Sequence, residues 1–465
     1  MRFRVLPSVA LFALSISGCM EQGNQVARPP SGLEPGIVRS PARATATSTA
    51  QRAEMAETVE PTGVITLKEA LGLALVQNPE LRASYWGVRV ADAGRLQASL
   101  RPNPELEVEV EEVGGAGDRS GFDGAETTIQ IAQPIELGQK RAKRTALAAL
   151  EKDLAQWDYE AKRLDVRTEV TKAFVEVLAA QQRVQLTEEL LKLSQELLET
   201  VAQRVDAGKD SPLEKTKAAV VVSNSRIQHE QAIRNLQVAR KQLASTWAAG
   251  ALMFERAAGR LDSMDPVPLI EALTDSIARN PDIARWAAEI EKAKAALEVE
   301  KAKAVSDISL SGGFRKFNET DDNAAVFGVS LPLGVSDRNQ GGRLQATYNL
   351  ARAREEEKAT RTRTRAELVR AYHSLSNAYA EAIELENNIL QGAETVFEAS
   401  KEGYSQGKLD YLNVLDAQRT LSEVRTRYID ALAAYHSSKA DVERLIGEDL
   451  QNVENPLEVT GEESK

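Results

Sequence analysis

The sequence predicts a mostly α-helical protein made of one duplicated half, in which each half combines a long helical hairpin with a short, membrane-spanning β-hairpin. Alanine, leucine, glutamate, arginine, lysine and glutamine dominate, and aromatic residues make up only 5% of the chain, a composition typical of long helices. Leu67-Lys-Glu-Ala-Leu71, followed by Asn78-Pro79, returns as Leu269-Ile-Glu-Ala-Leu273, followed by Asn280-Pro281. A period of roughly 200 residues is far longer than that of a solenoid, so it indicates a duplication.

The N-terminus carries the pattern of a bacterial export signal. Arg2 and Arg4 precede an apolar run over residues 5–17 that is too short to span a membrane, and Cys19 follows a small residue. Because this pattern resembles the lipobox of bacterial lipoproteins, we expect residues 1–18 to be removed and Cys19 to be acylated. An ordinary signal peptide that contains one buried cysteine is the alternative. Residues 19–62, rich in Pro, Ala, Thr and Ser, are predicted to form an extended arm.

The charge and hydropathy of the chain exclude two classes of structure. The formal net charge is −11, and an acidic chain is a poor ligand for nucleic acid, whose phosphates need basic patches. After the signal, no apolar run reaches the length of a membrane-spanning helix. If the chain crosses a bilayer, it must therefore do so with strands.

Each half, residues 63–265 and residues 266–448, is predicted to begin with a helix. Apolar residues recur at helical spacing over residues 66–100 and again over residues 268–305. A polar tail of residues 449–465 follows the second half. The two halves are therefore predicted to share one order of elements.

A β-hairpin follows each of these helices. Within residues 104–134 and 307–333, two segments alternate between apolar and polar side chains across a polar loop. Strands of about 8–10 residues suit a tilted transmembrane strand. Four strands cannot close a barrel, since the smallest outer-membrane barrels use eight. A spanning form must contain two or more copies, and the strand count leaves open whether there are two or three.

A very long helix follows each hairpin. Residues 139–204 contain neither Gly nor Pro, and the matching stretch of residues 344–403 is interrupted only by Gly392. Some 66 helical residues extend about 100 Å, and such a helix needs neighbouring helices along its length. The chain is expected to turn near residues 205–213 and 403–411, with Asp210-Ser211-Pro212 capping the first return helix.

Over residues 64–448, this ordered set of motifs resembles the outer-membrane efflux factor family, the TolC-like exit ducts of tripartite pumps. The resemblance rests on the duplicated Leu-x-Glu-Ala-Leu and Asn-Pro segments, the two β-hairpins and the glycine-containing tips. Tyr404-Ser-Gln-Gly407, with Asp416-Ala-Gln418 downstream, is especially close to the second tip of that family. Pro134-Ile-Glu-Leu-Gly-Gln-Lys-Arg141 is similar to the Glu-Leu-Gly-Gly-Lys-Arg stretch of its heavy-metal branch, with Gln139 replacing the second glycine.

The resemblance implies a homotrimer in which twelve strands form one outer-membrane barrel and twelve long helices form a periplasmic tunnel. It implies a periplasmic adaptor, an inner-membrane pump of the resistance-nodulation-division type, and the outer-membrane lipid of a Gram-negative bacterium as partners. The duct catalyses no reaction and needs no cofactor besides the lipid on Cys19. Heavy-metal cations are the expected cargo, and a duct for drugs or other organic solutes is the alternative.

Four acids, Glu105, Glu107, Glu109 and Glu111, alternate with apolar residues in the first predicted strand. In a membrane-spanning strand the apolar set faces lipid and the acidic set faces the lumen. A ring of carboxylates would concentrate cations and disfavour anions. The alternative, that these acids are only solvated, stays open.

The resemblance implies that Tyr404 and Asp416 occupy the positions of residues that close the periplasmic gate in the family. Glu214 matches the acid of the first tip in the same way. Asn413 stands where the best-known member of the family has a further Asp, and Leu409 replaces an Arg, so the charged network is incomplete. A solvated acid at a helix end is the alternative for Asp416 and Glu214.

The two tips are the predicted contact surface for the helical hairpin of the adaptor. Glycine permits the tight turns there, because it adopts positive φ at little cost. The residues assigned to the turns and to this contact are Arg204, Val205, Gly208, Lys209, Gly407 and Lys408.

Neither a metal site nor a catalytic set is predicted. His229, His373 and His436 are isolated in the sequence, and zinc or copper would need converging ligands. No nucleophile–base pair or phosphate loop appears, which argues against an enzyme. A lipid-anchored periplasmic coiled-coil scaffold without a pore is the remaining alternative, and the duplicated β-hairpins argue against it.

Overall fold

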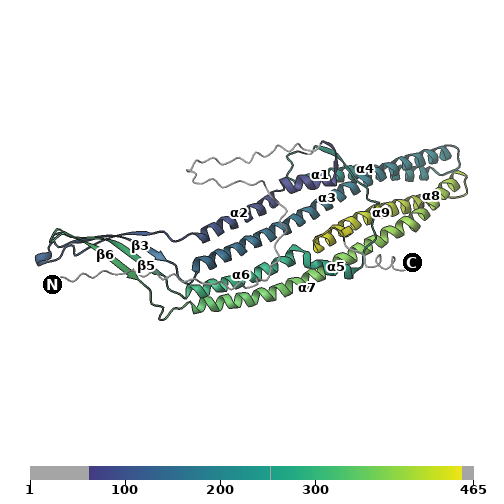
Figure 1. Cartoon of the computed structure of the whole chain (residues 1–465). Coiled ribbons are helices and arrows are strands. Elements are labelled where there is room, and N and C mark those ends of the chain that lie inside the picture. The colour runs from purple at the N-terminus through teal and green to yellow at the C-terminus, as the bar shows by residue number, and fades with distance from the viewer. Residues whose placement is uncertain (1–61, 252, 453–465) are drawn as a thin grey trace, which may run out of the picture.

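The computed structural model describes residues 62–251 and 253–452, so the predicted signal peptide, Cys19 and the predicted arm as far as residue 61 lie outside the described residues. The described chain is long and narrow. A four-stranded sheet lies at one end, and the turns of the two helical hairpins lie at the other. Long helices run between the two ends (Figure 1). The predicted fold class, long helical hairpins with four strands, is confirmed.

The two halves share one order of helices and β-hairpin strands, and the first half also contains two further short strands. The first half holds β1 (Gly63–Thr66), α1 (Leu67–Gln77), α2 (Pro79–Ser99), β2 (Glu105–Glu111), η1 (Gly117–Arg119), β3 (Glu126–Ile135), α3 (Lys140–Asp206), α4 (Pro212–Ser245) and β4 (Phe254–Ala258). The second half holds α5 (Ile270–Ser276), η2 (Ile277–Arg279), α6 (Pro281–Lys303), β5 (Ile308–Phe317), β6 (Asp322–Ser330), α7 (Gln340–Glu384), η3 (Leu385–Ile389), α8 (Leu390–Ser405), α9 (Tyr411–Ile446) and η4 (Leu450–Asn452).

The single helix predicted over residues 66–100 is in fact two helices, α1 and α2, and the same break precedes α6. Proline lacks an amide hydrogen and disfavours helical backbone in the residue before it, so one helix ends and another begins there. Asn78 (φ −55°, ψ 122°) and Asn280 (φ −59°, ψ 130°) are accordingly non-helical.

Each asparagine of these breaks also ties two helices together. The Asn78 side chain accepts a hydrogen bond from the Leu81 amide (2.9 Å) and donates one to the Thr246 carbonyl at the end of α4 (2.7 Å). Asn280 accepts from the Asp282 amide (2.7 Å) and donates to carbonyls at the end of α9, those of Arg444 and Leu445 (2.9 Å each). The repeated Asn-Pro therefore fixes the helix that leads to the sheet onto the end of the return helix.

The helix α3 runs for 67 residues and packs against neighbours over its length. It contacts α2 and α6 on the side of the sheet and α4 and α9 on the side of the turns. Its buried residues recur three or four positions apart, as Val166, Val170, Phe174 and Val177 do, which places them on one stripe. Tertiary packing along this stripe supplies the stability that an isolated helix lacks.

The second long helix, predicted over residues 344–403, is interrupted, and the interruption lies before Gly392, which is part of a helix. The helix α7 passes through a π-helical segment, Leu385–Ile389, into α8. A π turn accommodates an extra residue in an otherwise α-helical stretch. Leu385 stays buried at this point, so the apolar contact continues across the irregularity.

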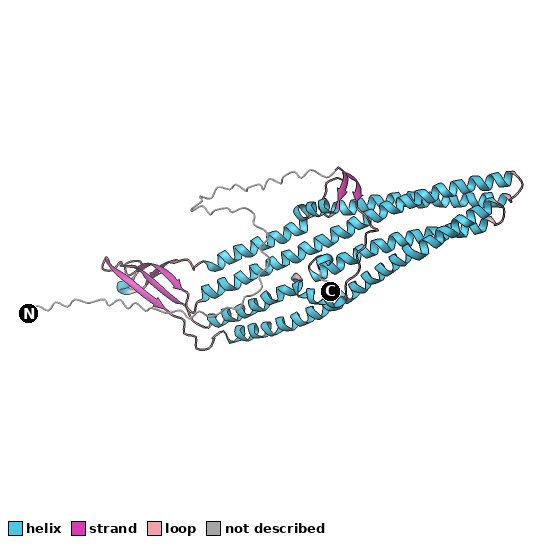
Figure 2. Ribbon diagram, turned by 45° about the vertical axis from the view of Figure 1, so that its right-hand side comes forward, coloured by secondary structure: helices cyan, strands magenta, loops and turns pink. Residues whose placement is uncertain are grey.

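The four-stranded sheet is antiparallel, with the order β2-β3-β5-β6. The strand β3 pairs with β5 over ten residues, from Glu126 opposite Phe317 to Ile135 opposite Ile308, so the hairpins of the two halves make one sheet. A separate parallel pair, β1 and β4, lies beside the middle of the helices (Figure 2). The Gln181 side chain of α3 holds β4 by donating to the Ala257 carbonyl (3.0 Å) and accepting from its amide (2.8 Å).

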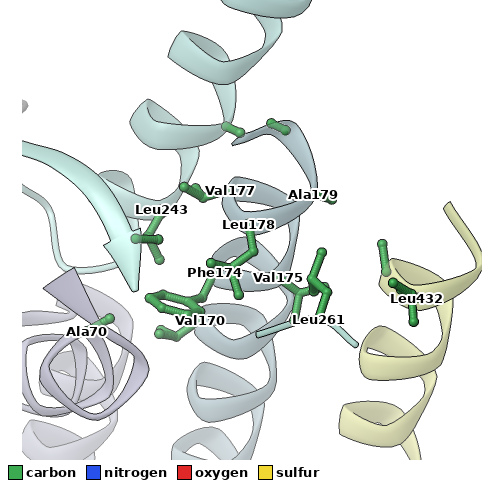
Figure 3. Packing of buried hydrophobic residues seen from close by; sticks show 14 of the residues in the cluster. Ala70, Val170, Phe174, Val175, Val177, Leu178, Ala179, Leu243, Leu261 and Leu432 are labelled. Carbon is green, nitrogen blue, oxygen red and sulfur yellow. The ribbon is translucent and has the colours of Figure 1, made fainter. Parts of the chain in front are cut away.

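The main apolar core lies in the middle of the molecule, where α3 is packed between the two return helices. Phe174 and Leu178 of α3 lie between Leu243 of α4 and Leu432 of α9 (Figure 3). Each of these side chains is buried. The core therefore holds the helical hairpins of the two halves side by side.

The long elements stand in a row with two borders. Near the sheet the contacts run α2–α3–α6–α7, in the same order as the strands, and toward the turns they run α4–α3–α9–α8 (Figures 1 and 2). One border is thus formed by α2, β2 and α4 of the first half. The other is formed by α7, β6 and α8 of the second half.

Candidate functional site

The two faces of the four-stranded sheet differ in chemistry. The register pairs Leu106 with Ile131, Val108 with Ile129, and Ile129 with Phe314, so these apolar side chains share one face. Each of them is more than half exposed. A continuous exposed apolar surface of this kind is typical of a surface that meets lipid or another protein.

The acidic row lies on the opposite face. Strand alternation places Glu105, Glu107, Glu109 and Glu111 there together. Glu107 accepts a hydrogen bond from Gln130 (2.8 Å), and Glu111 pairs at 3.0 Å with Arg315, which also pairs with Glu126 (2.8 Å). Within the described residues Glu105 and Glu109 form no ion pair or hydrogen bond through their carboxylates. Because Gln130 is neutral, Glu105, Glu107 and Glu109 all keep an uncompensated charge, and Arg315 offsets that of Glu111.

At the opposite end of the molecule, the two helical hairpins turn in the same way. Gly208 (φ 72°) and Gly407 (φ 73°) adopt left-handed backbone, which glycine tolerates best. The Lys209 amide donates to the Arg204 carbonyl and the Lys408 amide donates to the Gly403 carbonyl, both at 2.8 Å. This bond closes the last turn of each helix, so the duplication extends to the backbone of the tips.

The two turns are joined by Arg204, Asp210 and Tyr404, which we call the tip triad. The Asp210 carboxylate accepts hydrogen bonds from Arg204 Nε (2.7 Å) and Nη2 (3.1 Å), and the Tyr404 hydroxyl donates to its Oδ2 (2.6 Å). The Arg204 guanidinium lies 4.6 Å from the centre of the Tyr404 ring, which is buried. Both residues of the first tip therefore hold a tyrosine of the second.

Charge and burial keep each member of the tip triad in the form that its hydrogen bonds require. The bonds from Arg204, and then the bond from Tyr404, lower the pKa of the Asp210 carboxyl, and partial burial opposes them. Burial, and next the Asp210 carboxylate, raise the pKa of the Tyr404 hydroxyl. At neutral pH the carboxylate is therefore charged and the hydroxyl keeps its proton.

Asp210 is a site residue that the sequence prediction missed. The sequence pattern predicts a role for it in capping the return helix, but Ser211 is the N-cap of α4 and its hydroxyl accepts a hydrogen bond from the Leu213 amide (3.3 Å). An arginine six residues before an aspartate, across a glycine turn, was the available signal. The tyrosine that completes the set lies 194 residues away, so only the tertiary structure reveals it.

Glu214 lies beside the tip triad but outside it. Its Oε2 is enclosed and has no hydrogen-bond partner among the described residues. Tyr411 packs against Tyr404 with ring centres 5.7 Å apart, and burial followed by the charge of Glu214 raises the pKa of Tyr411 to about 12. Glu214 is thus an acid held against the tyrosine pair between the hairpins.

Asp416 is not brought together with Tyr404 and Glu214. Its side chain is 73% exposed and pairs only with Arg419, one turn further along α9 (3.2 Å). It stands on a ridge of α9 between a groove toward α4 and a groove toward α8, and Leu409 and Asn413 line the second groove. In a single chain Asp416 is therefore free to meet a ligand or another copy.

The remaining tip residues divide into exposed and packed groups. Lys209 and Lys408 are exposed at the outermost point of the hairpins. Val205 packs against the apolar cluster that fills the space between the two hairpins. The predicted contact surface therefore presents two ammonium groups, while Arg204 and Val205 serve the packing of the tips.

Within residues 62–251 and 253–452, no helix has the length and apolar character needed to cross a membrane. The same part of the chain holds no cluster of three or more His, Cys, Asp or Glu side chains that could bind a metal ion. His229 contacts the Thr187 hydroxyl (3.2 Å), and His436 contacts the Leu261 carbonyl (2.8 Å). These two histidines serve helix packing.

A sheet with one exposed apolar face, carried by duplicated helical hairpins, defines a membrane-channel class of protein. The model of a family described as outer membrane efflux protein matches residues 70–249 and 272–448. The chain belongs to this family, and it is an outer membrane efflux channel that catalyses no reaction.

Individual relatives and solved structures agree with this assignment. The chain is 35% identical to the cobalt-zinc-cadmium resistance protein CzcC of Cupriavidus metallidurans over 83% of this chain and 91% of that protein. It is 26% identical to the nickel and cobalt resistance protein CnrC of the same organism, over 62% and 67% of the two chains. A crystal structure of CusC superimposes with a TM-score of 0.71 at 18% identity, covering 82% of this chain and 92% of that one, which shows the shared fold.

Proposed function

We propose that three copies of this chain form the exit duct of a tripartite efflux system, through which heavy-metal cations pass across the outer membrane. The observation that carries the proposal is the pair of open borders. Among the described residues, the strands β2 and β6 each have a partner on one side only. Unpaired backbone groups in lipid cost several kcal/mol each, so the β2 of one copy is expected to pair with the β6 of the next.

The helices at the two borders support the same head-to-tail arrangement. On one border, Trp86 and Val90 of α2 are 60% and 72% exposed; on the other, Leu344 and Tyr348 of α7 are 52% and 64% exposed. Unlike borders that meet around an axis produce a closed ring. Three copies would supply twelve strands, and the choice of three over two rests on the resemblance to the family.

The tips support an adaptor as the next partner along the path. Each copy presents Lys209 and Lys408 at the end away from the sheet, so a trimer would present six ammonium groups. The family relationship favours a periplasmic adaptor there and an inner-membrane pump of the resistance-nodulation-division type beyond it. A lipid on Cys19 would add a second attachment to the outer membrane.

Two observations favour metal cations over organic solutes as cargo. The relatives CzcC and CnrC are named for resistance to cobalt, zinc, cadmium and nickel. The polar face of the sheet carries the acidic row, and carboxylates that line a lumen raise the local cation concentration. Selection would lie mainly in the pump, and the duct would supply a path that favours cations.

The tip triad is the proposed periplasmic gate, with Glu214 beside it and Asp416 exposed on the ridge of α9. Its hydrogen bonds join the tips of the two hairpins within one chain. Separation of the hairpins would break them, so the triad would favour a closed arrangement of the tips. Three copies of Asp416 would add carboxylates to the same end of the path.

The decisive experiment measures conductance of the purified, full-length oligomer in planar bilayers. Discrete channels with a cation preference are the expected result, whereas a folded oligomer without conductance would favour the scaffold alternative. Deletion of the gene, followed by growth on zinc, cobalt, cadmium and common drugs, tests the cargo. Sensitivity to drugs but not to metals would favour the organic-solute duct.

A further inference from the structure

Two arginines without partners line one cavity where the sheet meets the helices. Arg101 lies in the link between α2 and β2, and Arg141 lies in the first turn of α3. Within the described residues, neither guanidinium forms an ion pair or a hydrogen bond, and both residues are exposed. Both side chains therefore present an unpaired positive charge to the same cavity.

The neighbouring charges leave this cavity positive. Lys140 pairs with Asp307 (2.7 Å) and Lys143 pairs with Glu298 (3.4 Å). Glu136, the acid of the cavity wall, is held by Arg144 at 2.6 Å. The acids of the cavity wall and of the adjoining helices already have their own cations, and the unpaired Glu105 lies on the opposite face of the sheet from the cavity wall. Arg101 and Arg141 are therefore left to an anion from outside the chain.

The position of the cavity indicates the kind of anion. Gln133 and Ile135 form part of its wall, and strand alternation puts them on the same face as Ile129 and Ile131, at the end of β3 that leads into α3. The exposed apolar face of the sheet therefore runs directly into the basic cavity. A glycerophospholipid matches this arrangement, because its acyl chains would contact the apolar face and its phosphate would reach the basic cavity.

We propose that Arg101 and Arg141 bind the phosphate of an anionic glycerophospholipid whose acyl chains lie along the apolar face of the sheet. Guanidinium groups bind phosphate through paired, charge-assisted hydrogen bonds. This inference rests on the proposed placement of the sheet in the membrane, where the cavity lies at the level of the headgroups nearest the periplasm. Bound lipid would fix the depth of the sheet at its junction with α3.

Two other occupants are separable by experiment. Free inorganic phosphate would use the arginines but gain nothing from the apolar face. An acidic side chain of an adjacent copy would occupy the cavity only in the oligomer, since Arg101 lies near the border formed by α2 and β2. The lipid differs from both because its binding needs the arginines and the acyl chains together.

The test uses the full-length oligomer in a neutral detergent, with added short-chain phosphatidylglycerol, and reads bound lipid by native mass spectrometry and the melting temperature. We expect phosphatidylglycerol to bind and to raise the melting temperature, and the R101A/R141A double variant to bind it about tenfold more weakly or worse. The matched control is Arg95→Ala, on an exposed arginine of α2 that pairs with Asp92. It should bind lipid as the unchanged protein does.

Three results would overturn the proposal. One is equal binding by the double variant, and another is an equal effect of inorganic phosphate at the same concentration. The third is dissociation of the double variant into single chains, which would assign the arginines to the interface between copies; Arg141→Lys, which keeps the charge but not the planar fork, should stay assembled and bind less lipid. Conductance of the same samples separates this inference from the proposed function, because a channel that conducts without binding lipid refutes only the inference.

Discussion

The Tyr404 hydroxyl donates a 2.6 Å hydrogen bond to the Asp210 carboxylate, and this bond joins the two halves of the duplicated chain at their tips. Arg204 holds the same carboxylate through two nitrogens. The first tip thus supplies an ion pair and the second supplies a neutral donor. Each hairpin turns in the same way, yet the carboxylate that accepts these bonds comes from the first tip and the tyrosine from the second, so the two tips are complementary.

Removal of this bond is expected to favour the open arrangement of the tips. A charge-assisted hydrogen bond contributes roughly 1.5–3 kcal/mol, so Tyr404→Phe or Asp210→Asn should raise the open-to-closed ratio about tenfold or more. Single-channel recording in planar bilayers measures this ratio. Asp206→Asn is the matched control, since that exposed acid approaches Lys215 only to 3.9 Å. Equal effects of D206N and D210N would show that net charge, not the bond, governs opening.

The tip triad should be insensitive to pH near neutrality and fail in acid. The Asp210 pKa is lowered in the folded protein from an ordinary value of 3.8. Its contribution is therefore fully present above pH 3.8 and is lost as the pH falls through the lower folded value. Channel opening should stay constant between about pH 5 and pH 8 and rise only below that range. In D210N, the increase in channel opening at low pH should be absent. If opening of the unchanged protein instead increased with a midpoint near neutral pH, this assignment of Asp210 would be contradicted.

Local patterns predicted the elements of this chain well, and long-range contacts remained hidden. Helical spacing, strand alternation and the two glycine turns are local signals, and the long helices and the β-hairpins lie close to their predicted ranges, whereas the short strands β1 and β4 are not predicted. The break at Pro79 and the π segment at Leu385 each affect only a few residues, so the spacing of apolar residues over a long helix does not reveal them. Of the site residues, the family resemblance identifies Tyr404, whereas the local sequence around its partner Asp210 is typical of a helix N-cap.

The paired asparagines should contribute strongly to stability. In Asn280→Ala, α6 loses its N-cap and two partly buried carbonyls of α9 lose their donor, which together should cost about 2–4 kcal/mol. Asn78→Ala removes one such donor and should cost somewhat less. Denaturation followed by circular dichroism measures both, with the exposed Asn235→Ala of α4 expected to stay within about 0.5 kcal/mol. If N280A were as stable as N235A, the Asn-Pro joint would not hold the helices together.

The left-handed residues at the start of the two long helices should respond in opposite ways to glycine. Gln139 (φ 60°) makes no side-chain cap bond, so Gln139→Gly should stabilise the chain by up to about 1 kcal/mol by relieving its backbone. Asn339 (φ 55°) donates to the carbonyl (2.9 Å) and carboxylate (2.6 Å) of Glu300, so Asn339→Gly should destabilise it. Thermal unfolding of both variants checks the contrast, and a gain in N339G would remove any role for the Glu300 contact.

The acidic row should set the ion preference of the duct through the two glutamates that have no partner. Glu111 is already offset by Arg315, whereas Glu105 and Glu109 keep their full charge on the polar face. The E105Q/E109Q double variant should therefore lower the cation-over-anion permeability ratio by about twofold or more, measured as a reversal potential in a salt gradient. Glu111→Gln should change the ratio less. An unchanged ratio in the double variant would mean that these two carboxylates are only solvated and do not set the cation preference.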